Sequence, residues 1–487
     1  MSSNNKNNNR LKIFTAIVAT VQFIIGALLF MEFVFMDILP LRYLLAYGIF
    51  VVVFFIAVMF STKKKKLSIV FTVLSACLAV GMVWTLRTVV KLDNTVQTTS
   101  AAADTKEANT IVVDVVVLAD DEAQTVADLA GSEVGYIEAD GVVESALVQL
   151  RSELSSDIST TSYEGMTGVA SALIDGSQRA IVIEESYLQI LGEIEEYSVL
   201  SDGVKVVTSY EISDAEVYVS YDQNQAISAG ENAFVLYVSG VDTYGSVSAK
   251  SRSDVNILVV VNRSTGKILM INTPRDSYVS LPMGTNSKDK LTHAGLYGVD
   301  VSMAALEATY GVDIDYYVRI NFTGFKEIID ALGGITVYSD YSFSTTKGGY
   351  AISKGENVLD GAKALSFARE RKAFSDGDFQ RGKNQMKVIA AVISKMQSPE
   401  MLANFDTLMD EVSESFQTSM SSELIYDIVK TQLANGTDWD IETLSVTGSG
   451  GKTYTYTMPT LKSSVIYLDE SSIAEATKEI KEVLELE

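Results

Sequence analysis

The sequence predicts an α/β protein with three N-terminal transmembrane helices, a small α/β accessory domain and a larger mixed-sheet α/β sandwich. Three uncharged runs, at residues 13–31, 43–62 and 67–86, each approach the ~20 residues that cross a hydrocarbon core. Strand and helix patterns alternate from about residue 110 and again from about residue 231. The predicted parts are a tail with the three spans (1–90), a linker (91–109), the accessory domain (110–225) and the larger domain (231–487).

Lysine and arginine positions predict the orientation of these spans. Lys6, Arg10 and Lys12 precede the first span, and four lysines at residues 63–66 connect the second to the third. The positive-inside rule places these cations in the cytoplasm, so everything after about residue 90 is expected outside the membrane.

Composition excludes several classes of protein. The net charge of −24 argues against a nucleic-acid binder. The single cysteine, Cys77, lies in an apolar run, which excludes disulfides and thiolate metal sites in a monomer. The single histidine, His293, limits triad chemistry to one candidate, and a lone histidine is more often a structural hydrogen-bonding group.

The accessory region reads as alternating strands and helices. Strands are predicted for IVVDVVVLA and GSEVGYI, helices for residues 121–129 and 142–154, and a further strand and helix for AIVIEESYLQIL. No glycine-rich phosphate loop or ligand cluster stands out there, so the sequence leaves its ligand open.

The larger domain begins with three apolar runs that bring charged residues together. Residues 255–261 and 267–273 flank a turn and predict a β-hairpin, and residues 233–239 form a strand just upstream. If the three are successive antiparallel neighbours, one edge collects Asp242, Arg252, Asp254 and Arg275. Such an edge suits a divalent cation beside a multiply charged anion, and a rim of surface ion pairs is the alternative.

The rest of this domain alternates helices and strands. Helices are predicted at 301–310, 323–332, 360–371 and 378–396, strands at 316–322 and 335–338, a glycine-containing loop at 341–350, and helices plus the strand SSVIYL in the tail.

A second basic cluster lies between Asp360 and Lys387. Arg369 and Arg371 fit a helix end better than one helix face, whereas Arg381 and Gln385 are four residues apart and share a face. Converging arginines ~6 Å apart repel by ~3 kcal/mol at an effective dielectric constant of 20, so such a cluster needs an anion between its members. The alternative is a solvated basic helix face.

The order of seven motifs resembles the LytR–CpsA–Psr family. They are GVD, SRSD, NTPRDS, DKLTHAG, DALGG, LDGAKALSFARER and DFQRGKNQ, and the layout of the whole chain is similar to the capsule-type (CpsA) branch. The resemblance implies a Mg²⁺-dependent phosphotransferase on the outer face of a Gram-positive membrane. Such enzymes move a capsular or other cell-wall glycopolymer from a polyprenyl-pyrophosphate carrier to peptidoglycan.

The resemblance also implies site residues. Asp242 and Asp254 would bind Mg²⁺. The pyrophosphate would be held by Arg252, Arg275, Lys290, Arg369, Arg371, Arg381 and Gln385. The KLTHAG stretch around Lys290 departs from the family's Lys-Ile-Asn-like pattern. Arg275, Arg369 and Arg371 are the expected catalytic cations. Asp378 is expected to act as a general base or to orient Arg381.

Partners and alternatives follow from the same reading. The expected partners are the lipid-linked glycan, peptidoglycan, the membrane and other capsule-synthesis membrane proteins, with no nucleic acid. Residues 325–332 and 388–396 could line a pocket for the polyprenyl tail or simply pack in the core. The competing functions are a polyprenyl-pyrophosphate hydrolase and a non-enzymatic regulator or scaffold of capsule synthesis.

Overall fold

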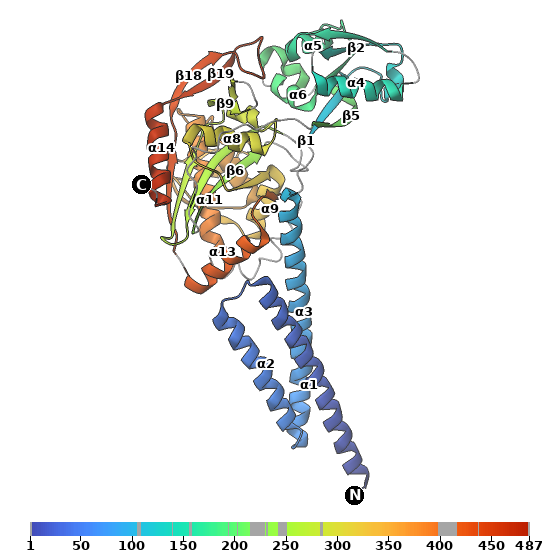
Figure 1. Ribbon diagram of the computed structural model, residues 1–487, viewed down its shortest axis with the longest axis vertical. Coiled ribbons are helices and arrows are strands. Elements are labelled where there is room, and N and C mark those ends of the chain that lie inside the picture. Colours follow the sequence, from blue (N-terminus) through green and yellow to red (C-terminus); the bar gives the residue numbers. More distant parts are fainter. Residues whose placement is uncertain are drawn as a thin grey trace.

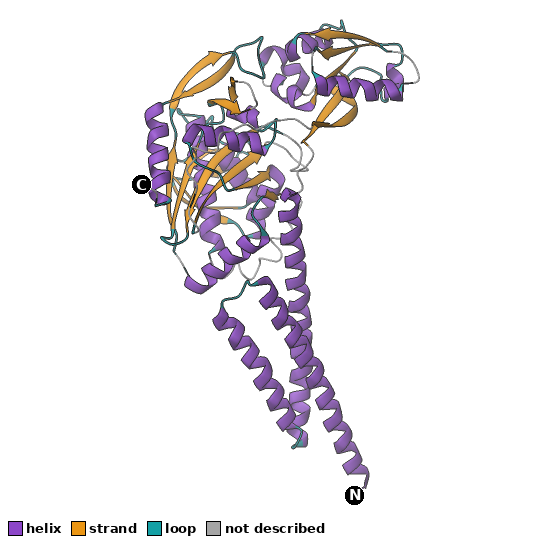
Figure 2. Ribbon diagram, in the orientation of Figure 1, coloured by secondary structure: helices purple, strands orange, loops and turns teal. Residues whose placement is uncertain are grey.

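The chain forms three parts along one long axis (Figure 1). The computed structural model describes residues 2–104, 109–138, 140–154, 158–192, 194–201, 203–214, 229, 232–241, 251–282, 286–397, 416–436 and 438–485. A helical anchor occupies one end, a large α/β domain the middle, and a smaller α/β domain the other end (Figure 2).

Within the described chain, three helices are long and apolar enough to cross a membrane. They are α1 (Ser2–Met36), α2 (Leu41–Ser61) and α3 (Lys65–Asp104). Residues 91–104, predicted as linker, instead continue α3. Extending an existing helix by one residue costs far less than nucleating a new one, and Val96 is fully buried against the large domain.

A polar seam pairs α1 with α3. The hydroxyl of Thr15 lies 2.8 Å from that of Ser68 and 2.7 Å from that of Thr72. Further along, Ser75 donates to Gln22 Oε1 at 3.4 Å. Polar groups in a hydrocarbon environment need partners inside the protein, so these contacts favour one packing of the two helices.

The anchor docks on helix α13 (Ser422–Asn435) of the large domain. Met36, Val96 and Tyr426 form a shared apolar cluster. The polar contacts around it are Tyr426 OH to Asp93 (2.9 Å), Lys430 Nζ to Asp37 (2.6 Å), and Arg42 Nη2 to the carbonyls of Leu433 and Ala434 (2.9 Å each). The large domain is therefore held against the anchor by packing and charge as well as by the covalent chain.

The accessory domain is a mixed sheet with helices on both faces. Its strands, in the order β3-β2-β4-β1-β5, are β3 (Ser159–Tyr163), β2 (Glu133–Ile137), β4 (Ala180–Glu184), β1 (Asn109–Leu118) and β5 (Val204–Asp214). Strand β2 runs parallel to β3 and β4, whereas β1 is antiparallel to β4 and β5. The helices are α4 (Gly141–Glu153), α5 (Gly165–Ile174), α6 (Glu185–Leu191) and the short 3₁₀ helices η1 (Val126–Leu129) and η2 (Glu195–Ser201).

The predicted helix at 121–129 is only the short helix η1. Asp121 accepts a hydrogen bond from the backbone of Ala123, which favours a turn, and it also pairs with Arg179. Thr125 and Asp128 then form a capping box that starts the helix at residue 126.

The large domain is built on a mixed sheet in the order β16-β11-β6-β7-β8-β17. These strands are β16 (Phe416–Thr418), β11 (Tyr316–Asn321), β6 (Ala233–Val241), β7 (Ser253–Asn262), β8 (Lys267–Asn272) and β17 (Asp440–Ser445). The predicted hairpin and its upstream strand are successive antiparallel neighbours, while β11 runs parallel to β6 and β17 parallel to β8.

Helices cover both faces of this sheet, which confirms the predicted α/β sandwich. One core lies beneath α8 (Val299–Tyr310) and α14 (Glu470–Val483), and the other beneath α11 (Asp378–Met396) and α13.

The remaining elements surround the sheet. They are α7 (Leu291–Ala294), α9 (Phe322–Ala331), α10 (Gly361–Arg369), and the paired strands β9 (Tyr278–Pro282) with β10 (Asn286–Lys290), β12 (Ile335–Ser339) with β15 (Gly355–Leu359), β13 (Phe343–Ser344) with β14 (Ala351–Ile352), and β18 (Gly448–Thr453) with β19 (Ser463–Leu468).

The docking of α13 generates a testable expectation. Tyr426→Ala removes the ring from the anchor cluster and the hydrogen bond to Asp93, so amide exchange in α13 should accelerate at least ~tenfold, or ~1.4 kcal/mol. Hydrogen–deuterium exchange of the full-length protein in detergent measures this. Tyr338→Ala, at an exposed tyrosine of β12, is the matched control. Unchanged exchange in α13 would contradict the docking.

Candidate active site

Charged and apolar side chains line one cavity of about 310 Å³, where strands β6, β7 and β11 of the large sheet begin or end. Its polar wall consists of Asp254, Arg275, Arg369, Glu370, Arg371, Lys372, Arg381 and Gln385, with Thr346 and Lys347 from a neighbouring loop. The structure therefore brings Arg275 together with arginines that lie more than ninety positions later in the sequence.

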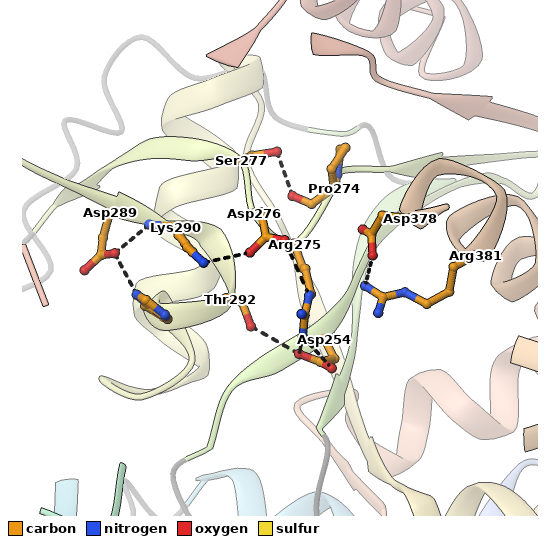
Figure 3. A network of polar contacts seen from close by, with 11 residues as sticks. Asp254, Pro274, Arg275, Asp276, Ser277, Asp289, Lys290, Thr292, Asp378 and Arg381 are labelled. Atoms are coloured by element: carbon orange, nitrogen blue, oxygen red, sulfur yellow. Dashed lines mark hydrogen bonds and ion pairs between the residues drawn. The ribbon is translucent and has the colours of Figure 1, made fainter. Parts of the chain in front are cut away.

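Strand register places Asp254 beside Arg275. Strands β7 and β8 pair Ile257 with Asn272, and extending this antiparallel register by three residues sets position 254 opposite position 275. Arg275 Nη1 donates to both oxygens of Asp254, at 2.9 and 3.0 Å, and Thr292 Oγ1 donates to the same carboxylate at 3.3 Å (Figure 3).

The carboxylate of Asp254 stays ionised although only 15% of its side chain is exposed. Burial raises its pKa, but the charges of Arg275, Arg381 and Arg252 and the hydrogen bond from Arg275 outweigh burial, so the pKa is lowered. The cavity thus holds a negative charge bound among cations.

Helix α11 brings Arg381 and Gln385 to the cavity on one face, as the spacing of four residues predicts. A Cβ atom on Gly382 would stand 2.2 Å from Asn272 Nδ2, so the glycine lets α11 approach the end of β8 closely. Burial lowers the pKa of Arg381, and the neighbouring cations Arg275 and Arg371 add to this effect.

Helix α10 ends at Arg369, and Arg371 lies two residues further along the chain. Both arginines are therefore at a helix end, as predicted. The guanidinium of Arg369 lies 3.9 Å from the centre of the Phe322 ring, a cation–π contact that fixes it at the cavity wall. Between them, Glu370 is buried and accepts hydrogen bonds from Thr346 Oγ1 and the backbone of Ala373, at 3.0 Å each.

Sequence reasoning missed Glu370 and the loop that it holds. Burial raises the pKa of Glu370, but hydrogen bonds from the backbone of Thr346 and Ala373 outweigh burial, so the pKa is lowered. The carboxylate thereby ties Thr346 and Lys347, which line the cavity, to the arginine segment. The sequence does show an acid between two arginines. It does not show that Glu370 binds Thr346, because that partner lies 24 residues away in the chain.

Three other predicted residues lie beside the described cavity wall. Arg252 is buried near Asp254, and its charge lowers the pKa of that carboxyl group. Lys290 Nζ lies 3.2 Å from Asp276 Oδ1, and Arg275 Nε lies 3.7 Å from Asp276 Oδ2. Asp378 Oδ1 lies 2.7 Å from Arg381 Nη2 (Figure 3). Asp242 lies outside the described residues.

The rest of the cavity is apolar. Its wall includes Val238, Val255, Ile320, Phe322, Phe325, Leu365, Ala368 and Ile389. Phe325 comes from α9 and Ile389 from α11, the two helices considered from the sequence for a lipid pocket. A compartment with an arginine-rich wall and an apolar wall suits an amphiphile with an anionic head group.

His293 lies in a structural network rather than in the cavity wall. Its Nδ1 is 2.7 Å from Asp289 Oδ1, and both side chains are buried. Asp289 also accepts from the backbone nitrogen of Thr457 at 2.7 Å, which joins α7 to the segment before β19.

The side chains that could bind a metal ion in the cavity are carboxylates. Among the described residues, no group of three or more His, Cys, Asp or Glu side chains is arranged to hold an ion. Asp254 lines the cavity and neighbouring arginines lower its pKa, and Mg²⁺ commonly takes one or two carboxylates together with substrate phosphates and water.

The charge balance at Asp254 predicts a pH-dependent effect of Arg275→Gln. In the parent, the pKa of Asp254 is lowered in the folded state, so the ionised carboxylate stabilises the fold above about pH 4. This stabilisation is lost as the pH falls through the folded-state pKa. Without Arg275 the pKa rises, so the variant should lose ~1–3 kcal/mol at about pH 7, and the deficit should shrink as the pH falls below about 4, through the lowered pKa of the parent.

Thermal unfolding of the full-length protein across this pH range measures the effect. Arg179→Gln, which removes a partly exposed pair with Asp121, should cost less than ~1 kcal/mol. A deficit for Arg275→Gln that does not change with pH would contradict the assignment.

More than half of the chain is similar to a known protein family. Residues 200–482 match the family model described as LytR_cpsA_psr family. The polyisoprenyl-teichoic acid–peptidoglycan teichoic acid transferase TagU of Halalkalibacterium halodurans is 30% identical over 310 residues, which cover 61% of this chain and 96% of that protein. TagT of Bacillus subtilis, which has the same transferase description, is 35% identical over 202 residues, or 39% of this chain.

The chain spans 62% of the length of TagT. The crystal structure of B. subtilis TagV aligns with 53% of this chain and 99% of its own, at 27% identity and a TM-score of 0.45. The match of residues 200–482 covers more than half of the sequence, and the likeness to TagU spans nearly all of that relative. The chain therefore belongs to the LytR–CpsA–Psr family.

Proposed function

We propose that this protein is a membrane-anchored phosphotransferase that moves a glycopolymer from a polyprenyl-pyrophosphate carrier to peptidoglycan. The observation that carries the proposal is the cavity in which Asp254, Arg275 and Arg381 meet an apolar wall. The relatives TagT and TagU are named for the transfer of polyisoprenyl-linked teichoic acid to peptidoglycan. The three spans and the accessory domain favour a capsular or related cell-wall polymer as the cargo.

The cavity chemistry suits phosphoryl transfer. The arginines hold the pyrophosphate, and the apolar wall takes the start of the polyprenyl tail. An acceptor hydroxyl attacks the phosphorus that carries the sugar, and the bond from that phosphorus to the bridging oxygen breaks. Polyprenyl phosphate leaves, and the proton of the hydroxyl is released to solvent. This reaction asks the protein mainly for positioning and for positive charge around the transferred group.

Mg²⁺ is proposed as the cofactor, held by Asp254 and Asp242. When bound, it would neutralise charge on the pyrophosphate oxygens. Asp254 fits this role because its pKa is lowered and the carboxylate is ionised. Arg275 balances that charge through its two contacts with Asp254.

Asp378 is proposed to orient Arg381. The two side chains are three residues apart on α11, with a contact of 2.7 Å that commits the carboxylate to the guanidinium. A carboxylate engaged in this way fixes the direction of the arginine better than it accepts a proton.

The proposed orientation places both α/β domains outside the cytoplasmic membrane. The chain start and the lysines at residues 63–66 lie at the end of the anchor opposite the domains (Figure 1). The positive-inside rule then puts the cavity on the outer side, where peptidoglycan is found.

The arginines provide the first test. Arg275→Ala and Arg381→Ala should each lower transfer of a lipid-linked glycan to peptidoglycan by ~10²–10³-fold, because charge stabilisation at the pyrophosphate is lost. Arg263→Ala, at the opposite end of the same hairpin and paired with Asp427, should retain parental activity.

Assays with and without peptidoglycan decide between the alternatives. Release of polyprenyl phosphate without acceptor, at the same rate as with it, would favour a hydrolase. Full polymer attachment in cells that carry Arg275→Ala would instead favour a regulator or scaffold.

The metal assignment is tested at Asp254. Asp254→Asn should raise the Mg²⁺ concentration for half-maximal activity at least ~tenfold and weaken Mn²⁺ binding measured by paramagnetic resonance. Asp276→Asn, at the acid bound to Lys290, is the control and should change Mn²⁺ binding much less. Equal Mn²⁺ affinity in the parent and in Asp254→Asn would remove Asp254 from the metal site.

A further inference from the structure

We propose that a surface of tyrosines on the large domain binds the acceptor, a glycan strand of peptidoglycan. This tyrosine surface consists of Tyr278 on β9, Tyr454 and Tyr456 after β18, and Tyr467 on β19. The inference deepens the proposed function and rests on it for the class of acceptor. It adds a second binding site, outside the arginine-lined cavity.

Three tyrosines of this surface are exposed, and the fourth, Tyr278, contacts two of them. Tyr454, Tyr456 and Tyr467 are 51%, 47% and 41% exposed. Tyr278 and Tyr467 meet edge to face with ring centres 5.7 Å apart, and Tyr278 OH donates to the carbonyl of Tyr454 at 3.3 Å. Adjacent exposed aromatic side chains are uncommon on a surface without a ligand, and tyrosine offers sugars an apolar face together with a hydroxyl.

A glycine makes room for one ring of the surface. A Cβ atom on Gly451 would stand 2.5 Å from Cε2 of Tyr467, so the tyrosine ring lies directly across β18 where a side chain is absent. The antiparallel pairing of β18 with β19 holds both strands in register from Gly448 to Thr453. A ring that is already ordered loses little conformational entropy when a ligand stacks on it.

The charge of the tyrosine surface complements an anionic strand. Lys288 Nζ lies 5.8 Å from the centre of the Tyr278 ring, and Lys462 Nζ lies 5.5 Å from that of Tyr454. Residues 448–468 contain two lysines and no acid, although the whole chain has a net charge of −24. Peptidoglycan strands carry carboxylates on their stem peptides, so a local basic surface attracts them.

The tyrosine surface adjoins the chain segment that follows Arg275 of the cavity wall. The backbone nitrogen of Ile466 on β19 donates to the carbonyl of Asp276 at 2.8 Å, and Ser277 forms a bridge with Ile466. Strand β19 therefore pairs with the segment that directly follows Arg275, and Tyr278 lies three residues beyond that arginine.

Position favours the acceptor over the donor glycan as the occupant. The carrier already holds the donor through its tail and pyrophosphate, whereas the acceptor lacks a lipid anchor and needs a surface of its own. Strands β9, β18 and β19 lie toward the end of the large domain that faces away from the anchor (Figure 1). In the proposed orientation this end faces the wall.

Co-sedimentation with peptidoglycan sacculi, stripped of attached anionic polymer, tests the inference on the full-length protein in detergent. The double substitution Tyr454→Ala and Tyr467→Ala should raise the apparent Kd ~tenfold. Gly451→Ala should do the same while keeping every tyrosine, because its methyl group displaces the Tyr467 ring. Tyr338→Ala, at a tyrosine 55% exposed on β12, should bind as the parent does.

Binding of polyprenyl pyrophosphate in nanodiscs separates this inference from the proposed function. The tyrosine variants should bind the carrier as the parent does. If the parent itself fails to bind the carrier while the variants still bind sacculi more weakly than the parent, the proposed function fails and the glycan surface stands. Sacculi binding by Gly451→Ala and the double variant at parental strength would overturn the surface. If the tyrosine variants bind soluble anionic glycopolymer more weakly than the parent but bind sacculi equally well, the acceptor assignment is overturned.

Discussion

The ion pair between Asp254 and Arg275 is the contact on which the charge balance of the site depends. It joins a residue at the start of β7 to one just beyond the end of β8, and it supplies negative charge beside Arg275 and Arg381. Arginines held ~6 Å apart would repel by ~3 kcal/mol at an effective dielectric constant of 20. Asp254 and Asp378 offset part of that repulsion, and a multiply charged anion in the cavity would offset more. The folded protein thus carries an arginine-rich cavity that suits a multiply charged anion.

The same architecture links this charge to an apolar wall and to the anchor. Helix α11 presents Arg381 and Ile389 to the cavity and packs with α13 against one face of the sheet. Helix α13 in turn holds the anchor through Tyr426 and Lys430. The arginine-lined wall, the apolar wall and the three apolar helices are therefore connected through a short run of packed elements. This arrangement suits the lipid-linked substrate proposed above.

Sequence reasoning reached the residues whose position follows from local rules. Strand direction alone put Asp254 beside Arg275, and helix spacing put Arg381 beside Gln385. It missed what depends on tertiary contacts, such as the loop that Glu370 holds in the cavity wall. The helical continuation through residues 91–104 was also missed, because polar composition resembles a linker while docking on α13 decides the structure. The roles of the site residues stay predictions, and Asp242 lies outside the described residues.

Native mass spectrometry of the full-length protein, titrated with polyprenyl pyrophosphate and with the uncharged polyprenol of equal length, tests the central claim most directly. If Asp254 and the arginines organise one cavity for a lipid-linked pyrophosphate, the parent should form a one-to-one adduct with the pyrophosphate that inorganic pyrophosphate displaces. The polyprenol should bind far more weakly. Equal retention of both lipids, with no competition by inorganic pyrophosphate, would contradict the account.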